Sequence, residues 1–238
     1  MKQKLYEGKA KILYPTEKAN EYLVYFKDDA TAFNNLKKAV LENKGVLNNN
    51  ISTLIFKLLE KNKIPTHFIK QVSEREMLVK KVSIIPLEVI VRNKIAGSFA
   101  KRYGLTEGGD INPPVVEFCY KNDALGDPLM PEEHIYVLRL ASLEEIQEIR
   151  EMTLRINKIL IKFFKDVGIA LADFKIEFGR TEDGRILLAD EISPDSCRLW
   201  DIETGEKLDK DRFRRDLGKV TESYREVLKR VSRTDLSS

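Results

Sequence analysis

Charged and apolar residues alternate through the segment Leu171–Gly179, LADFKIEFG. As a β-strand, this segment places Asp173, Lys175 and Glu177 on one face and its phenylalanine and isoleucine side chains on the other. The apolar face would pack into a core. The charged face could bind a phosphate or a divalent cation, or it could be the solvated face of an ordinary amphipathic strand.

A second strand is expected in the segment Arg185–Glu191, RILLADE. If positions 183 and 184 form a two-residue turn, the resulting hairpin places Glu177 directly opposite Asp190. Two carboxylates that face each other across a ladder repel, whereas a bound Mg²⁺ ion would reverse the sign of that interaction. Lys175 beside them would contact a phosphate or orient a carboxylate.

The segment Pro86–Gly104, PLEVIVRNKIAGSFAKRYG, predicts a strand that ends near Arg92 and a short helix that begins at Gly97 and Ser98. The free N–H groups at the start of a helix suit an anion. Ser98 adds a hydroxyl group, and Arg92 adds a planar guanidinium that can bind two oxygens at once. The pattern favours a pocket for a phosphate monoester, and the alternative is a capped surface helix with a solvated arginine.

Near the N-terminus, the segment Tyr6–Tyr14, YEGKAKILY, combines a glycine with two lysines. Gly8 permits a tight turn, and Lys9 and Lys11 alternate onto one face of the following strand. Such an arrangement can hold nucleotide phosphates, although it lacks the spacing of a P-loop or of a G-x-G-x-x-G motif. The alternative is a basic hairpin at a sheet edge, where lysines commonly block further strand pairing.

The segment Glu191–Asp201, EISPDSCRLWD, follows the proposed hairpin. Pro194 ends the extended structure, so Asp195, Ser196 and Arg198 could reach a ligand from the exit of the strand. An ordinary polar loop is the alternative.

A second loop, Lys121–Pro128 or KNDALGDP, supplies Lys121, Asp123 and Asp127. Acidic residues in loops most often serve the turn itself. Taken together, however, the five segments provide lysines, a carboxylate set for Mg²⁺ and an Arg/Ser anion pocket. Phosphoryl transfer needs this combination, because its catalysis consists mainly of positioning and charge neutralisation.

The surrounding sequence predicts the elements that must position these residues. Strands are expected within residues 5–14, 22–26, 68–72, 77–82 and 87–92, with a helix over 45–61. Residues 104–131 are rich in Gly, Pro, Asn and Asp and predict a long irregular region. A helix is expected to begin with a Ser142–Glu145 capping box and to end at Gly168, followed by a hairpin over 169–192 and two helices near 209–217 and 219–232. The order favours an α+β protein with a β-rich N-terminal lobe and a mixed α/β C-terminal lobe.

Composition narrows the class of protein. The 238 residues suit one large domain or two small lobes, and 42% hydrophobic with 33% charged residues is typical of a soluble globular chain. A net charge of +3 is too small to indicate a nucleic-acid partner. The two cysteines are expected to be reduced thiols. The chain shows neither a signal peptide nor the ~20 apolar residues that span a bilayer, so we expect no membrane association and a cytoplasmic location.

Several of these segments resemble a known family. PLEVIVRNKIAGS and LADFKIEFG resemble the two signature motifs of the SAICAR synthetases, the phosphoribosylaminoimidazole-succinocarboxamide synthases. Other landmarks of that family are YEGKAK, LVKKV at 78–82, INPP at 111–114, KNDALGDP and DEISPDSCRLWD. The resemblance extends in order from about residue 5 to about residue 230.

The resemblance implies a reaction and an architecture. These enzymes use ATP to join the carboxylate of carboxyaminoimidazole ribonucleotide (CAIR) to the amino group of L-aspartate, giving SAICAR, ADP and phosphate. An acyl phosphate intermediate is expected, with ATP and Mg²⁺ as cofactors. The implied fold has two lobes around a nucleotide cleft and is related to ATP-grasp. The resemblance also implies a homodimer. We expect a nucleotide-binding lobe at 1–82 and a substrate- and metal-binding lobe at 83–238.

The resemblance also implies roles for individual residues. Those expected at the nucleotide are Lys9, Ala10, Lys11, Lys80, Lys81, Val82, Lys121 and Glu177. Those expected at the substrates are Arg92, Ser98, Asp195, Ser196 and Arg198. The expected metal ligands are Asp127, Asp173, Glu177 and Asp190, and the expected catalytic residues are Asp173, Lys175 and Asp190.

Three other functions are compatible with parts of the sequence. A small-molecule kinase on a related fold could use the same D-x-K hairpin. A nucleic-acid-binding module is disfavoured by the small net charge and by the absence of interleaved aromatic and basic residues. A non-catalytic paralogue is disfavoured because no motif is visibly broken.

Overall fold

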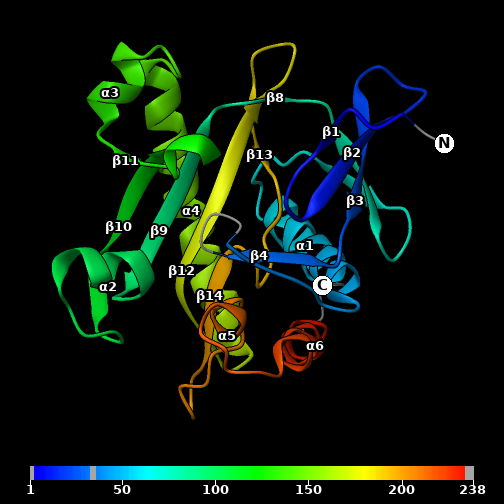
Figure 1. The fold of residues 1–238 in the computed structure, drawn as a ribbon. Coiled ribbons are helices and arrows are strands. Elements are labelled where there is room, and N and C mark those ends of the chain that lie inside the picture. The colour runs from blue at the N-terminus through cyan, green and yellow to red at the C-terminus, as the bar shows by residue number, and fades with distance from the viewer. Residues whose placement is uncertain (1–2, 33–35, 234–238) are drawn as a thin grey trace.

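The N-terminal part of the chain forms a five-stranded antiparallel sheet. The computed structural model describes residues 3–32 and 36–233. The order of the strands is β1 (Tyr6–Glu7), β2 (Lys11–Pro15), β3 (Glu21–Phe26), β7 (Glu76–Lys80) and β6 (Phe68–Gln71). Helix α1 (Lys44–Lys61) packs against β3 and β6 (Figure 1). Strands β4 (Asp29–Ala32) and β5 (Lys37–Val40) form a separate two-stranded sheet.

The rest of the chain builds a seven-stranded sheet around one central strand, β12 (Ile169–Arg180). The strand order is β11 (Leu129–Met130), β10 (Asp110–Tyr120), β9 (Leu87–Lys94), β12 and β13 (Ile186–Ala189). Strands β14 (Cys197–Asp201) and β8 (Ser83–Ile84) also pair with β12. Because β12 is the longest strand and pairs with four others, it forms the centre of this sheet.

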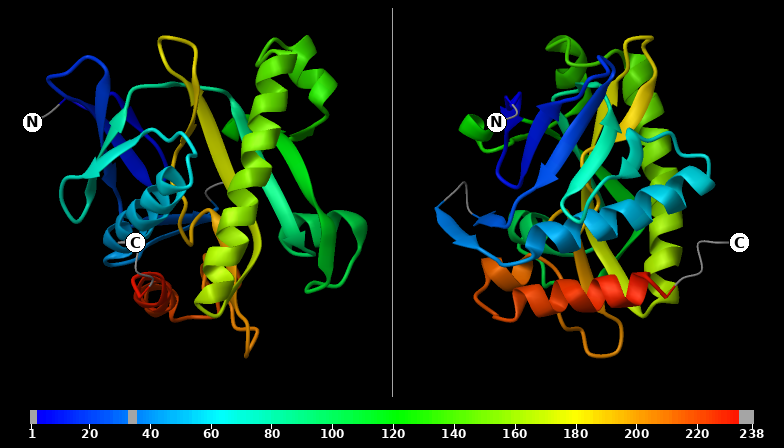
Figure 2. Two further views of the ribbon diagram at one scale, coloured as in Figure 1. Left: turned by 180° about the vertical axis from the view of Figure 1, so that it is seen from behind. Right: turned by 90° about the vertical axis from the view of Figure 1, so that its right-hand side faces the viewer.

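Helices cover this second sheet. Helix α4 (Leu143–Asp166) lies along one face and contacts β12 and β9 (Figure 2). Its predicted capping box is confirmed, and Gly168 follows its last turn with a φ of +74°. The shorter helices are α2 (Gly97–Tyr103), the 3₁₀ turn η1 (Asp123–Leu125), α3 (Glu132–Val137) and α5 (Asp211–Arg214), and α6 (Val220–Val231) lies beside α1.

One hydrophobic core runs through both sheets. It includes Phe26 of β3, Ile55 of α1 and Leu160 of α4 together with the apolar face of β12. That face comprises Phe174, Ile176 and Phe178, each at most 1% exposed, which confirms the predicted alternation. Since α1 and α6 also pack together, the division at residues 82 and 83 stays a prediction.

The expectation of a long irregular region over 104–131 is wrong, because eleven of these residues form β10. Its pairing with β9 is irregular between Asp110 and Val115, where the Asn112–Pro113 peptide bond is cis. From Val115 to Tyr120 the pairing is regular. Among the prolines and asparagines lies a short apolar run, which forms a strand because it pairs with the edge of β9.

The predicted register of the β12–β13 hairpin is also wrong. Glu177 pairs with Ala189, not with Asp190. The Thr181 N–H donates to the Arg185 carbonyl and the Gly184 N–H to the Thr181 carbonyl, so the turn is longer than two residues. A register change of one residue moves side chains to the opposite face of a sheet.

Candidate active site

An apolar cavity opens between the two sheets. Its walls come from β2, β3, β7 and the connection between the sheets, with the apolar lining residues Ile12, Leu13, Tyr22, Val24, Phe26, Met77, Val79, Val82 and Ile84. Four charged residues stand at one end of it: Lys11, Lys121, Glu177 and Asp190. A cavity with apolar walls and a few convergent polar groups is typical of a small-molecule site.

Lysines and carboxylates interlock at the charged end of this cavity. The Lys175 Nζ lies 2.7 Å from Glu177 Oε1 and 3.5 Å from Asp190 Oδ2. Lys121 forms an ion pair with Glu177, and Lys11 forms one with Asp190. Although burial raises the pKa of Glu177, the charges of Lys175 and Lys121 lower it to about 2. The carboxylate is therefore ionised and ready to neutralise a cation.

Asp190 reaches this cluster through its backbone conformation. It follows the last residue of β13 and has a φ of +62°. Had the strand continued, Asp190 would have pointed away from the face that carries Glu177, because Ala189 occupies the paired position. The left-handed conformation ends the strand and brings the Asp190 carboxylate to Lys175. Glu177 and Asp190 therefore converge on Lys175 through this turn and not, as predicted, through strand pairing.

The four predicted metal ligands lie in three settings. Glu177 and Asp190 converge on Lys175. Asp127 accepts the N–H of Asn122 at 2.8 Å and braces its own loop. Asp173 is paired with two arginines. Within residues 3–32 and 36–233, no three His, Cys, Asp or Glu side chains converge to hold a metal ion by themselves.

A carboxylate pair is nevertheless sufficient for a nucleotide-bound Mg²⁺, which takes its other ligands from phosphates and water. Beside Asp190, the Glu191 Oε2 is buried and lacks a hydrogen-bond partner within the part of the chain that the structure describes. A buried carboxylate oxygen without a donor favours a cation. The residues present therefore fit Mg²⁺ at Glu177 and Asp190, with Glu191 as a neighbour that the sequence did not predict.

A charged cavity lies over β9, β12 and β14. Its polar lining residues are Lys9, Thr31, Glu88, Arg92, Ser98, Asp173, Lys175, Asp195, Ser196, Arg198, Lys210 and Arg214. Lys175 thus lines the charged cavity while its ammonium contacts carboxylates at the end of the apolar one.

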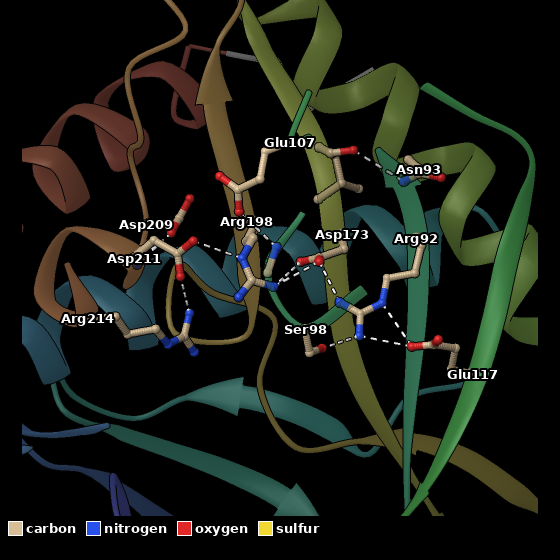
Figure 3. A network of polar contacts seen from close by, with 12 residues as sticks. Arg92, Asn93, Ser98, Glu107, Glu117, Asp173, Arg198, Asp209, Asp211 and Arg214 are labelled. Carbon is tan, nitrogen blue, oxygen red and sulfur yellow. Dashed lines mark hydrogen bonds and ion pairs between the residues drawn. The ribbon is translucent and has the colours of Figure 1, made fainter. Parts of the chain in front are cut away.

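Arg92 lies in a chain of ion pairs, between Glu117 and Asp173 (Figure 3). Its Nε donates to Glu117 at 3.0 Å, its Nη1 to Asp173 at 2.7 Å and its Nη2 to the Ser98 hydroxyl at 2.8 Å. Only 2% of Arg92 is exposed, so the alternative of a solvated arginine is wrong. Because all three of its nitrogens are engaged, Arg92 is placed to orient Asp173 and Ser98.

Arg198 continues the chain on the other side of Asp173. Its Nη1 donates to Asp173 at 2.9 Å and its Nε to Asp211 at 2.9 Å. Its guanidinium packs on Gly97, where an added Cβ would lie 2.3 Å from the Nη2 atom, and Gly97 has a φ of +52°. The glycine is therefore required both by the backbone and by the close approach of Arg198.

Asp195 and Ser196 sit at the edge of the charged cavity but are strongly engaged. The Asp195 carboxylate accepts Lys44 Nζ at 2.6 Å and Tyr224 Oη at 2.7 Å. Ser196 donates to the Glu191 carbonyl at 3.2 Å. The contacts tie helices α1 and α6 to the 193–196 loop, so this loop is fixed by the tertiary structure.

The remaining predicted residues are more dispersed. Lys9 forms an ion pair with Asp123 at 2.7 Å, and the Ala10 carbonyl accepts the N–H of Lys27. Lys80 and Val82 line the apolar cavity. Lys81 does not line it, and its ammonium lies over the Tyr22 ring, 5.9 Å from the centroid.

Sequence reasoning missed a group of residues in and behind the charged cavity: Lys44, Glu88, Lys210, Asp211, Arg214 and Tyr224. The one local signal was the density of charges in the stretch 206–216, EKLDKDRFRRD, which predicted only a helix. The residues act through partners far away in the sequence, and a local pattern does not reveal such partners.

Comparisons with known proteins identify a family. Residues 4–231 match the family model for SAICAR synthetase. A phosphoribosylaminoimidazole-succinocarboxamide synthase from Caldanaerobacter subterraneus subsp. tengcongensis is 59% identical over 230 residues, which cover 97% of each chain.

Solved structures indicate the same family. The crystal structure of phosphoribosylaminoimidazole-succinocarboxamide synthase from Ehrlichia chaffeensis is similar with a TM-score of 0.95 and 48% identity, covering 98% of this chain and 99% of that one. A SAICAR synthetase in complex with ADP has a TM-score of 0.93 and 48% identity, covering 95% and 97%. The α+β fold predicted from the sequence is confirmed, and the chain belongs to the SAICAR synthetase family.

Proposed function

We propose that this protein joins the carboxylate of CAIR to the amino group of L-aspartate at the expense of ATP, giving SAICAR, ADP and phosphate in purine biosynthesis. The observation that carries the proposal is the position of Lys175. Its side chain lines the charged cavity, and its ammonium contacts Glu177 and Asp190 at the end of the apolar one. A nucleotide phosphate and a substrate carboxylate would meet at this lysine.

The nucleotide would place its base in the apolar cavity and its phosphates at the charged end. The apolar lining from β2, β3 and β7 suits an aromatic base, and Lys11 and Lys121 supply positive charge for the phosphates. Lys80 and Val82 line this cavity and would border the base. The ADP complex of a relative supports nucleotide binding. Lys9, Ala10 and Lys81 are proposed to contact the nucleotide from outside the apolar cavity.

Glu177 and Asp190 would hold Mg²⁺ together with the nucleotide phosphates. The ion would neutralise charge on the transferring phosphoryl group. Lys11, Lys121 and Lys175 occupy the same neighbourhood and lower the electrostatic cost of bringing anions together there. Asp127, which lies on the loop that carries Lys121, is proposed as an outer acidic residue of this end.

Ser98 and Arg198 are proposed to bind the ribonucleotide. Arg198 has one terminal nitrogen, Nη2, without a partner among the residues that the structure describes, and Ser98 can still donate its hydroxyl hydrogen. Arg92 and Asp173 would position both groups. Asp195 and Ser196 would border the same cavity.

The proposed chemistry proceeds in two steps. A carboxylate oxygen of CAIR attacks the γ-phosphorus, the bond to the ADP oxygen breaks, and an acyl phosphate forms. The amine of aspartate then attacks the acyl carbon, phosphate leaves, an amide forms and the nitrogen loses a proton. The protonated Lys175 would stabilise the anions in both steps, since its carboxylate partners raise its pKa against the effect of burial.

A covalent enzyme intermediate is not needed, and neither cysteine is suited to form one. Both thiols are buried, and burial raises the pKa of Cys119 to about 11 and that of Cys197 further. Thiols with such pKa values are weak nucleophiles near neutral pH.

The test is substrate dependence of ADP release. Release of ADP and phosphate should require CAIR and aspartate together, with SAICAR as the product. A stable phosphorylated product formed without aspartate would contradict the ligase and indicate a kinase. We also propose that the protein is cytoplasmic and forms a homodimer. Light scattering of the purified protein would test the dimer by its mass.

A further inference from the structure

Glu107 lies in the glycine-rich loop of residues 104–109, which connects α2 to β10. Among the residues that the structure describes, those that line the charged cavity do not include Glu107. At the start of the loop, the Leu105 N–H donates to the Ala100 carbonyl at 2.9 Å. Near its end, the Gly108 N–H donates to the Ile95 carbonyl at 2.9 Å. The backbone on both sides of Glu107 is therefore held in place without any ligand.

One oxygen of the Glu107 carboxylate serves the start of helix α2. The helix begins after Ala96, whose side chain cannot accept the free N–H groups of the first turn. The Glu107 Oε1 accepts the Gly97 N–H at 3.0 Å instead. Gly97 packs against the Arg198 guanidinium, and Ser98 is the next residue of the helix. Glu107 thus fixes the backbone beside two groups that are proposed to bind the ribonucleotide.

The same carboxylate holds the segment around α5. Arg215 donates through Nη1 to Glu107 Oε2 at 2.9 Å and through Nη2 to Oε1. The Lys207 ammonium lies 3.6 Å from Oε2. The Arg215 Nη2 also lies 3.4 Å from Asp211 Oδ2, which accepts Arg198 Nε at 2.9 Å (Figure 3). Glu107 therefore connects two segments, the start of α2 and α5, that both contact Arg198.

The charge of Glu107 strengthens these contacts. The hydrogen bonds from Arg215 and Gly97 lower the pKa of Glu107 to about 2, although burial opposes them. The carboxylate is ionised near neutral pH, and charge-assisted hydrogen bonds are about twice as strong as neutral ones. The Glu107 side chain is 29% exposed and that of Arg215 is 38% exposed. Because water can reach both groups, a substitution of Glu107 should shift the segments that it holds without unfolding the protein.

We propose that Glu107 is a positioning residue of the ligase, which holds the start of α2 and α5 in place around Arg198 so that this guanidinium meets the ribonucleotide. The inference rests on the proposed function. Glu107 itself touches no substrate and acts through Gly97 and Asp211. The effect can be large, because misplacement of a binding group by about 1 Å can cost roughly a hundredfold in kcat/KM.

The test is a steady-state comparison of Glu107→Ala, Glu107→Gln and the control Glu182→Ala, which alters an exposed glutamate of the β12–β13 turn. Glu107→Ala should raise the KM for CAIR by about tenfold or more, with the KM for ATP within about twofold of the wild type. Glu107→Gln should recover most of the affinity, because its amide oxygen can still accept the Gly97 N–H. Circular dichroism and thermal unfolding check that each variant is folded.

A double-mutant cycle with Arg198→Lys separates positioning from a general loosening of the fold. Lysine keeps the positive charge of Arg198 but lacks the planar fork that reaches several acceptors at once. Since Glu107 is proposed to act through Arg198, Glu107→Ala should change the KM for CAIR by less than about threefold in the Arg198→Lys background.

The proposal is overturned if folded Glu107→Ala keeps the KM for CAIR, if the KM for ATP rises as much as that for CAIR, or if the effects of the two substitutions multiply fully. Should Arg198→Lys not fold, the KM values of the Glu107 variants decide the question alone. Failure of the wild-type protein to release ADP with CAIR and aspartate would contradict the proposed function itself, separately from the role of Glu107.

Discussion

The apolar cavity and the charged cavity take side chains from the same face of β12, yet they treat charge in opposite ways. The apolar cavity gathers its charges at one end, where Lys175 is shared between Glu177 and Asp190. The charged cavity distributes them along a chain of ion pairs that runs from Glu117 to Arg214. A nucleotide base can be bound by burial of apolar surface, whereas small, multiply charged substrates must be bound by charged groups at defined positions.

This difference has a consequence for mutational tests. Removal of one partner of a buried ion pair leaves an uncompensated charge and destabilises the fold strongly. Substitutions in the chain of ion pairs will therefore change folding and function together. Substitutions at the charged end of the apolar cavity, where several lysines share the carboxylates, should separate the two effects.

The largest effect is expected for Asp190→Asn. The variant loses one carboxylate of the proposed Mg²⁺ pair, so kcat should fall about 100- to 1000-fold. Thermal unfolding should stay near that of the wild type, because Lys11 and Lys175 are partly exposed and Lys175 keeps Glu177. Asp183→Asn, in the exposed turn of the same hairpin, is the matched control. Near-normal turnover by Asp190→Asn would remove the metal assignment.

Gly97→Ala tests the charged cavity without removing a charge. A methyl group would displace the Arg198 guanidinium, and misplacement of a binding group by about 1 Å can cost roughly a hundredfold in kcat/KM. Gly104→Ala is the control, because Gly104 has a similar φ of +64° with nothing within 4 Å of an added Cβ. Both variants should lose about 1–2 kcal/mol of stability through the positive φ. Equal activity in the two would show that Arg198 has room to move.

Tyr224→Phe tests how firmly the charged cavity is braced from behind. The variant removes the hydroxyl that donates to Asp195 and should lower the free energy of unfolding by about 1.5–3 kcal/mol. Urea unfolding measures the change, with the exposed Tyr103→Phe as the control. An unchanged midpoint would mean that Lys44 alone satisfies the Asp195 carboxylate.

His67 is buried and lines the apolar cavity, and His67→Phe tests how the stability of this region depends on pH. Burial, with the charges of Lys11 and Lys80, lowers the pKa of His67 to about 3. A histidine that is neutral when folded contributes stability above its unfolded pKa of about 6.5 and loses it as the pH falls toward 3. Between these limits the wild type should lose about 1.4 kcal/mol per pH unit more than His67→Phe. Urea unfolding at several pH values measures this, and parallel curves would show that His67 is protonated in the folded protein.

Local patterns predicted the parts of the fold that depend on neighbours in sequence. The capping box at Ser142, the stop at Gly168 and the alternation of β12 all rest on contacts within a few residues. The predictions for residues 104–131 and for the hairpin register were wrong, because each structure depends on something outside the local pattern. For β10 this is the edge of β9, and for the hairpin it is one extra residue in the turn.

The sequence by itself determined the family, the α+β class and the strand whose charged face lies at the centre of the site. Only the tertiary structure decided which charges meet. Arg92 and Asp173 are 81 positions apart, and Lys44 and Asp195 are 151 apart. Ion pairs over such separations depend on how whole elements pack. The left-handed conformation at Asp190 depends on the same packing, because a side chain meets only the neighbours that the fold brings to it.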